Sequence, residues 1–189
     1  QDRPEFHRRV VTAAWKYRWA RPGKRLQHRV DLLDLNYVFM PWISSTFREL
    51  YLDDPENRNA ILRYNYENLF IMKWGYNMTY NSRSIRDGRT NYGTNGYIVR
   101  MGVESSGNLL YGLSKAGLSN INSMGQYTFF NIAYAQYVKA DFDYSKSFIF
   151  DKRNSLALHF GLGVAYPYGN STILPYEKRY FSGGANSVR

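Results

Sequence analysis

The sequence predicts an all-β fold, specifically part of an antiparallel transmembrane β-barrel. Three observations predict it. Side-chain character alternates with a period of two, the two resulting faces differ sharply in chemistry, and short and long connections alternate along the chain. A period of two is that of a β-strand, because a helix would scatter both sets of residues around its circumference.

Composition narrows the function classes. The chain has 189 residues, 25 Lys and Arg against 15 Asp and Glu, a formal net charge of +10 and no cysteine. This length allows one domain with a real core. The lack of cysteine excludes a disulfide scaffold, a zinc–thiolate site, an iron–sulfur cluster and a cysteine nucleophile. No run of about 18 apolar residues occurs, so no transmembrane helix is predicted.

Six strands are expected within one partial barrel domain that covers residues 1–189. They lie near residues 10–20, 25–38, 70–83, 95–107, 127–147 and 154–166. The last strand alternates most regularly, with large apolar residues from Leu156 to Tyr166 and small or polar ones between them. The second strand is the least regular. Each has roughly the 9–11 residues that cross a bilayer at a tilt.

The chemistry of the two faces favours a membrane barrel over a soluble sandwich, which would point large residues inward and charged residues outward. Here the second face carries glycines, amides and single charges that could not pack a core, as a barrel lumen requires, while the aromatic-rich face would meet lipid. The expected interfacial aromatic residues are Trp19, Tyr80, Tyr97 and Tyr166. The expected lumen-facing polar residues are Lys73, Asn77, Arg100, Glu104, Lys139, Asp141, Asp143 and His159.

The connections alternate between short and long. Tight turns are expected at 21–24 and 151–154 and a moderately short link at 84–94, whereas the links at 39–69 and 108–126 are longer. Bacterial outer-membrane barrels alternate in this way, with short periplasmic turns and longer extracellular loops.

A short helix is expected in the longest extracellular loop. Asp54 is a candidate N-cap and Pro55 occupies the first helical position. The segment 46–52 is expected to add another helical turn. Six strands cannot close a membrane barrel, and an open sheet in lipid would leave unpaired backbone groups. We therefore expect this chain to be part of a longer polypeptide.

The tail, residues 174–189, carries a specific motif. Ten of its positions resemble the sixth extracellular loop of the BamA/TamA outer-membrane assembly and translocation family, and the aromatic hairpins upstream resemble TamA-like lipoproteins of Bacteroidota. The matching positions are Pro175, Glu177, Arg179, Tyr180, Phe181, Gly183, Gly184, Ser187, Val188 and Arg189. The resemblance implies a barrel of sixteen strands, preceded by periplasmic domains, of which this chain supplies the sixth to the eleventh strand.

In that family the sixth loop folds back into the lumen, and the arginine of the motif meets an acidic residue on a later strand. The resemblance therefore implies that Arg189 is this arginine, that Gly183 and Gly184 give the tucked backbone its tight path, and that Glu177 and Arg179 make further contacts. It also implies unfolded client outer-membrane proteins as partners, together with outer-membrane lipids, lipopolysaccharide and periplasmic or inner-membrane accessory proteins.

Other functions have weaker support in the sequence. No nucleophile elbow, complete dinucleotide fingerprint or metal-ligand spacing of histidines occurs, so no catalytic residue, cofactor or metal is predicted. Asp141 and Asp143 are the best carboxylate pair, and we interpret them as part of a salt-bridge ladder. Basic residues lie singly on polar faces without stacking aromatics, which argues against nucleic-acid binding.

We therefore expect a non-catalytic factor that inserts or translocates proteins in the bacterial outer membrane. The alternatives are a passive pore or receptor barrel, or a barrel that anchors a fused hydrolase. A soluble β-sandwich binding domain is the third hypothesis.

Overall fold

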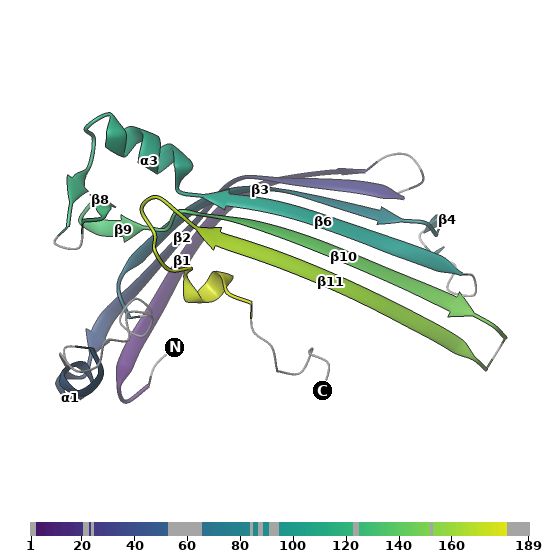
Figure 1. The fold of residues 1–189 in the computed structure, drawn as a ribbon, viewed down its shortest axis with the longest axis horizontal. Helices are drawn as coiled ribbons and strands as arrows, with labels where there is room; N and C mark the ends of the chain where they lie inside the picture. The colour runs from purple at the N-terminus through teal and green to yellow at the C-terminus, as the bar shows by residue number, and fades with distance from the viewer. Residues whose placement is uncertain are drawn as a thin grey trace.

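A computed structural model describes residues 3–20, 23, 25–52, 66–83, 85–86, 89–90, 95–122, 125–151 and 153–180. Six long strands form one sheet (Figure 1). Each long strand pairs in antiparallel fashion with the long strands that come before and after it in the sequence. They are β1 (Phe6–Ala20), β2 (Leu26–Ile43), β3 (Leu69–Asn81), β6 (Gly96–Ser106), β10 (Tyr137–Ile149) and β11 (Ser155–Pro167). The fold is therefore all-β.

The sheet is open. Within the described parts of the chain, β1 pairs only with β2 and β11 pairs only with β10, so both outer edges carry unpaired backbone groups. The β1–β2, β3–β6 and β10–β11 connections lie at one end, and the β2–β3 and β6–β10 connections, with their helices and short strands, lie at the other (Figure 1). We call these the short-connection end and the long-connection end.

Strand β2 contains an extra residue, which explains its irregular alternation. Lys16 of β1 pairs with Asp31, but the preceding Trp15 pairs with Leu33, so Leu32 has no partner in the register. Beyond this β-bulge, the odd- and even-numbered residues of β2 exchange faces of the sheet. As a result Asp31 and Asp34, three residues apart, both point to the same face.

The prediction of one continuous strand over residues 127–147 is wrong. The segment contains a small hairpin, β8 (Tyr127–Phe129) and β9 (Ile132–Tyr134), before β10 begins. Phe130 and Asn131, between these two strands, have φ angles of +53° and +61°. Two positive φ angles in a two-residue loop match the right-handed twist of a hairpin. A phenylalanine is a poor sequence signal for such a turn, because glycine, asparagine and aspartate dominate it.

The link expected as a loop from residue 108 to 126 contains a helix, α3 (Asn108–Lys115), and a short strand, β7 (Asn120–Ile121). The chain segment that links β3 to β6 contains a two-stranded ladder of its own, in which β4 (Ile85–Arg86) pairs with β5 (Arg89–Thr90).

The longest loop begins with α1 (Ser45–Phe47) and a π-helical turn, η1 (Arg48–Leu52). The helix expected to start at Asp54 lies outside the described residues. No helix in the described part of the chain is long and apolar enough to cross a membrane.

A small core lies at the long-connection end, on the same face as the charged residues. Leu69, Ile71, Ala135 and Tyr137 are buried together, and Leu174 packs against them. Strand β9 runs parallel to the start of β3 there, and the backbone N–H of Ala135 donates to the carbonyl of Phe70 at 2.9 Å. The core therefore joins the sheet to the loops above it.

Candidate functional site

The strand register places all eight predicted polar residues on one face of the sheet, which we call the polar face. Lys73 and Asn77 pair with Ser106 and Gly102, and paired residues of antiparallel strands share a face. Lys139 pairs with Glu104, and Asp143 pairs with Arg100. Asp141 lies between those two positions of β10, and His159 pairs with Ser145 of the same strand and face.

Several of these residues form ion pairs across neighbouring strands. Arg100 Nη1 lies 3.0 Å from Asp143 Oδ1, and His159 Nε2 contacts the other oxygen of the same carboxylate. Lys139 Nζ lies 3.9 Å from Asp141. Asp143 therefore takes part in ion pairs across three strands, whereas the ion pair of Asp141 lies within β10.

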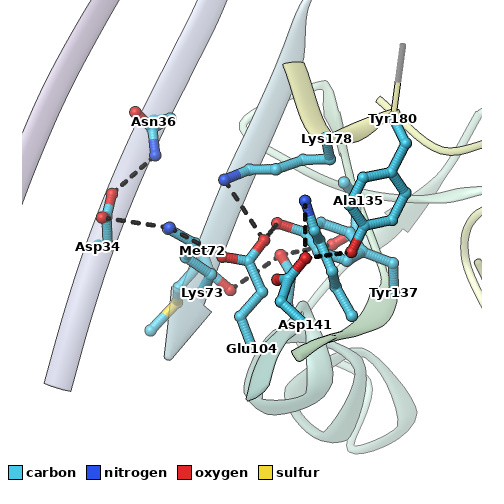
Figure 2. A network of polar contacts seen from close by, with 12 residues as sticks. Asp34, Asn36, Met72, Lys73, Glu104, Ala135, Tyr137, Asp141, Lys178 and Tyr180 are labelled. Carbon is cyan, nitrogen blue, oxygen red and sulfur yellow. Dashed lines mark hydrogen bonds and ion pairs between the residues drawn. The ribbon is translucent and has the colours of Figure 1, made fainter. Parts of the chain in front are cut away.

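A second series of charges crosses the sheet and reaches the tail (Figure 2). Lys73 Nζ of β3 lies 3.6 Å from Asp34 of β2 and 3.1 Å from Glu104 of β6. Lys178 Nζ, from the short helix η2 (Tyr176–Lys178), lies 3.4 Å from the same Glu104 carboxylate, which also accepts a 3.0 Å hydrogen bond from Tyr137. Burial lowers the pKa of Lys178, because an ammonium group loses solvation there.

Tyr180 binds further along the polar face. Its hydroxyl donates to the Asp141 carboxylate and to the Ala140 carbonyl, the latter at 3.3 Å, and Lys139 Nζ lies 4.0 Å from the centre of its ring. Burial raises the pKa of Tyr180, and its hydrogen bond to the Asp141 carboxylate raises it further. Figure 2 shows Lys178 and Tyr180 approaching the sheet from the same side.

Residues 174–180 therefore cross the polar face, and we call them the strap. Leu174 packs on the core and Pro175 is fully buried. Glu177 forms an ion pair with Arg8 of β1, while Tyr180 reaches β10. The strap thus connects strands near both edges of the sheet.

The turn between β11 and the strap is held by a buried network of amide groups and one hydroxyl. Asn170 Nδ2 donates to the carbonyls of Tyr127 and Tyr134 at 2.9 and 3.0 Å. Gln136 Oε1 accepts from the Asn170 backbone N–H at 2.9 Å, and Ser171 Oγ accepts from the Gln136 N–H at 2.8 Å. These bonds fix the turn after β11 to the small hairpin β8–β9.

The opposite face, which we call the apolar face, is exposed and continuous across the sheet. Its large side chains include Trp15 of β1, Trp74 of β3, Met101 of β6 and Phe160 of β11, with exposed fractions of 70, 51, 47 and 57%. Trp19, Tyr80 and Tyr97 lie towards the short-connection end, while Tyr166 lies at the other.

Part of the predicted motif can be placed. Pro175, Glu177 and Tyr180 make the contacts described above, and Arg179 Nε donates to the Leu174 carbonyl at 2.8 Å. The remaining motif positions lie outside the described residues: Phe181, Gly183, Gly184, Ser187, Val188 and Arg189.

Sequence reasoning missed several residues of this site. Asp34 was hidden by the bulge at Leu32, and the irregular alternation of β2 was its only signal. Arg8 and Lys178 gave no signal, because their partners are distant in sequence. Within the described ranges, no cluster of three or more His, Asp or Glu residues could hold a metal ion.

Comparisons with protein-family models, curated proteins and solved structures find no match to this chain.

Proposed function

We propose that this chain is a section of the wall of a transmembrane β-barrel in the bacterial outer membrane. The observation that carries the proposal is the exposed apolar face, which runs over all six long strands opposite a charged face. Water-soluble monomers rarely expose a contiguous apolar patch larger than a few hundred Å². Lipid solvates such a face without cost, and the polar face then lines an aqueous lumen.

The open edges agree with this proposal when further strands pair with β1 and β11. In lipid each unpaired backbone group costs several kcal/mol, so a membrane sheet has to close. The aromatic residues near the strand ends would lie at the two interfaces, where their rings contact both headgroups and lipid tails.

We further propose that the barrel inserts or translocates other outer-membrane proteins, as the BamA/TamA family does. Support comes from the tail motif and from the position of its described residues on the polar face. The strap is then a lumen-side brace that holds this part of the wall in shape. The proposed mechanism is addition of client strands to an unstable barrel seam, with local thinning of the membrane and without covalent chemistry.

The membrane proposal can be tested by cysteine scanning, because the chain has no native cysteine. Single cysteines at Leu158, Phe160 and Leu162 of β11 should react with a lipid-phase probe in vesicles and resist a water-soluble maleimide. Single cysteines at Ala157, His159 and Gly161 should show the reverse. Equal maleimide reactivity on both faces would contradict burial of the apolar face in lipid.

The assembly proposal needs the natural full-length protein in proteoliposomes. We expect it to accelerate the folding of a urea-unfolded outer-membrane barrel added from outside, compared with empty vesicles. A comparison variant carries Glu177→Gln and Lys178→Gln, which remove two of the ion pairs that hold the strap. Ion conductance without any acceleration of client folding would support the passive-pore alternative instead.

A further inference from the structure

We propose that the polar face holds a binding site for a phosphate-bearing anion near its short-connection end. A pocket of about 400 Å³ lies there, a volume within the range of small-molecule sites. It is separate from the strap contacts at Glu104. The side chains that carry the proposal are Arg18, Arg29, Asn77, Thr79 and Arg100, from strands β1, β2, β3 and β6.

Two arginines lie directly opposite each other in this pocket. Arg18 of β1 pairs with Arg29 of β2, which brings their Cβ atoms to roughly 4.5–5.5 Å. Like charges in this position destabilise a sheet, and an anion bound between them would offset the repulsion. Arg29 Nε forms an ion pair with Asp31 Oδ1 at 3.3 Å, but neither atom has a hydrogen-bond partner within the described chain. Arg18 has no ion-pair or hydrogen-bond partner within the described chain, so its guanidinium is available to a ligand.

The floor of the pocket offers neutral donors. Arg29 pairs with Asn77, and the next row contains Thr79. A Cβ at Gly102 would lie 2.9 Å from Asn77 Oδ1, so the glycine leaves room for the amide to lie against the sheet. An amide and a hydroxyl beside arginines add the donors that complete a phosphate site.

The carboxylates at the far rim do not cancel this charge. Asp143 is engaged by Arg100 and by His159, and Asp141 accepts from Tyr180. The Arg100 side chain is nevertheless 55% exposed, and a guanidinium carries five N–H donors. Arg18 is therefore the arginine of this pocket whose charge no carboxylate of the described chain offsets, because Asp31 pairs with Arg29 and Asp143 with Arg100. Arg100 lies on the other side of the pocket, three strands from Arg18 or about 14 Å.

Phosphate is the ligand class that fits this arrangement best. A guanidinium binds two phosphate oxygens at once through a planar fork, so Arg18 and Arg29, which are cross-strand neighbours, can share one phosphate. The second phosphate of a diphosphate would extend towards Arg100. The side chains of the proposed site all belong to strands of the sheet. The proposed site therefore does not depend on the proposed insertion activity.

The test is calorimetric titration of the full chain in detergent with sodium pyrophosphate at low salt. Arg18→Gln should weaken binding about tenfold or more, the scale of one lost charge-assisted contact. Arg18→Lys should lose less, because it keeps the charge without the fork. Thr79→Val should also weaken binding. The matched control is Lys115→Gln in α3, which removes one positive charge at the other end and should leave the affinity unchanged.

Sodium acetate should bind at least about tenfold more weakly than pyrophosphate, because it presents fewer oxygens and less charge. Glucose 6-phosphate and short-chain phosphatidylglycerol then distinguish a soluble sugar phosphate from a lipid headgroup as the source of the phosphate. The proposal is overturned by any one of three results. These are no pyrophosphate binding at millimolar concentration, an equal loss in Lys115→Gln, or acetate binding as tight as pyrophosphate.

Discussion

Tyr180 of the strap lies directly over Gly163 of β11. A Cβ at position 163 would come within 2.6 Å of Tyr180 Cε1, so the glycine provides the space in which the ring lies. Gly163 is paired with Asp141, the carboxylate that accepts the Tyr180 hydroxyl. The ring and its hydrogen-bond partner are therefore placed by one cross-strand pair.

Gly163→Ala should lift the end of the strap. Overpacking of this kind costs about 1–3 kcal/mol, and each 1.4 kcal/mol corresponds to a factor of ten in population. We expect trypsin to cleave after Lys178 or Arg179 about tenfold faster in native conditions, measured by mass spectrometry of the released tail. Gly161→Ala is the matched control, because the nearest atom to its Cβ is 3.8 Å away. Equal acceleration in both variants would refute the role of Gly163.

Glu104→Gln should destabilise the fold. Glu104 faces Lys73 and Lys178, whose side chains are only 13 and 15% exposed. Removing the carboxylate leaves two like charges beside each other, at a cost of about 2–3 kcal/mol after allowance for partial solvation. Guanidinium-induced unfolding of the variant and of the wild type gives the difference in unfolding free energy. Asp143→Asn, whose partner Arg100 is more than half exposed, should cost less than about 1 kcal/mol.

The contribution of Tyr180 to stability should disappear at alkaline pH. Its pKa is raised in the folded protein above the ordinary value of 10.0, so the folded state keeps the proton that the unfolded state loses. The stabilisation is therefore complete below pH 10 and falls as the pH rises further. The difference in unfolding free energy between wild type and Tyr180→Phe should be constant from about pH 8 to 9 and shrink above about pH 10. A difference that grows above pH 10 would contradict this assignment.

Deletion of Leu32 should disrupt the sheet. Without the bulge, the half of β2 on one side of position 32 must turn its side chains to the opposite face. Either Asp31 or Asp34 would then lie on the apolar face. We expect loss of the folded species, measured by far-ultraviolet circular dichroism and by heat-modifiable gel mobility. Leu32→Ala keeps the residue count, and its side chain is half exposed, so it should fold. Normal folding of the deletion variant would show that the bulge is dispensable.

Much of the strand pattern could be predicted from local sequence. The alternation along β3, β6 and β11 separates two chemically distinct faces because side chains in a strand point to alternate sides. The turn at residues 151–154 is also local: Asp151 Oδ1 accepts from the N–H groups of Arg153 and Asn154 at 2.7 and 2.9 Å. Aspartate before a tight turn is a recognisable signal for this geometry.

The rest depended on contacts between distant residues. The hairpin turn has only one residue that favours it, Asn131, because Phe130 takes the other position of positive φ. Asn170, about forty residues later in the chain, donates to the carbonyls of Tyr127 and Tyr134 on either side of this turn. The proximity of Arg18 to Arg29, and of Lys178 to Glu104, follows from register and from the path of the strap. No local pattern contains either.

The sequence by itself determined that the protein is a meander of long amphipathic strands, because alternate residues of a strand lie on opposite faces and differ here in polarity. Only the tertiary structure decided which charges meet. One extra residue in β2 reverses the facing of everything beyond it, and the strap joins strands that are far apart in the chain. Both effects depend on register and chain path, which arise from packing the whole sheet rather than from any single segment.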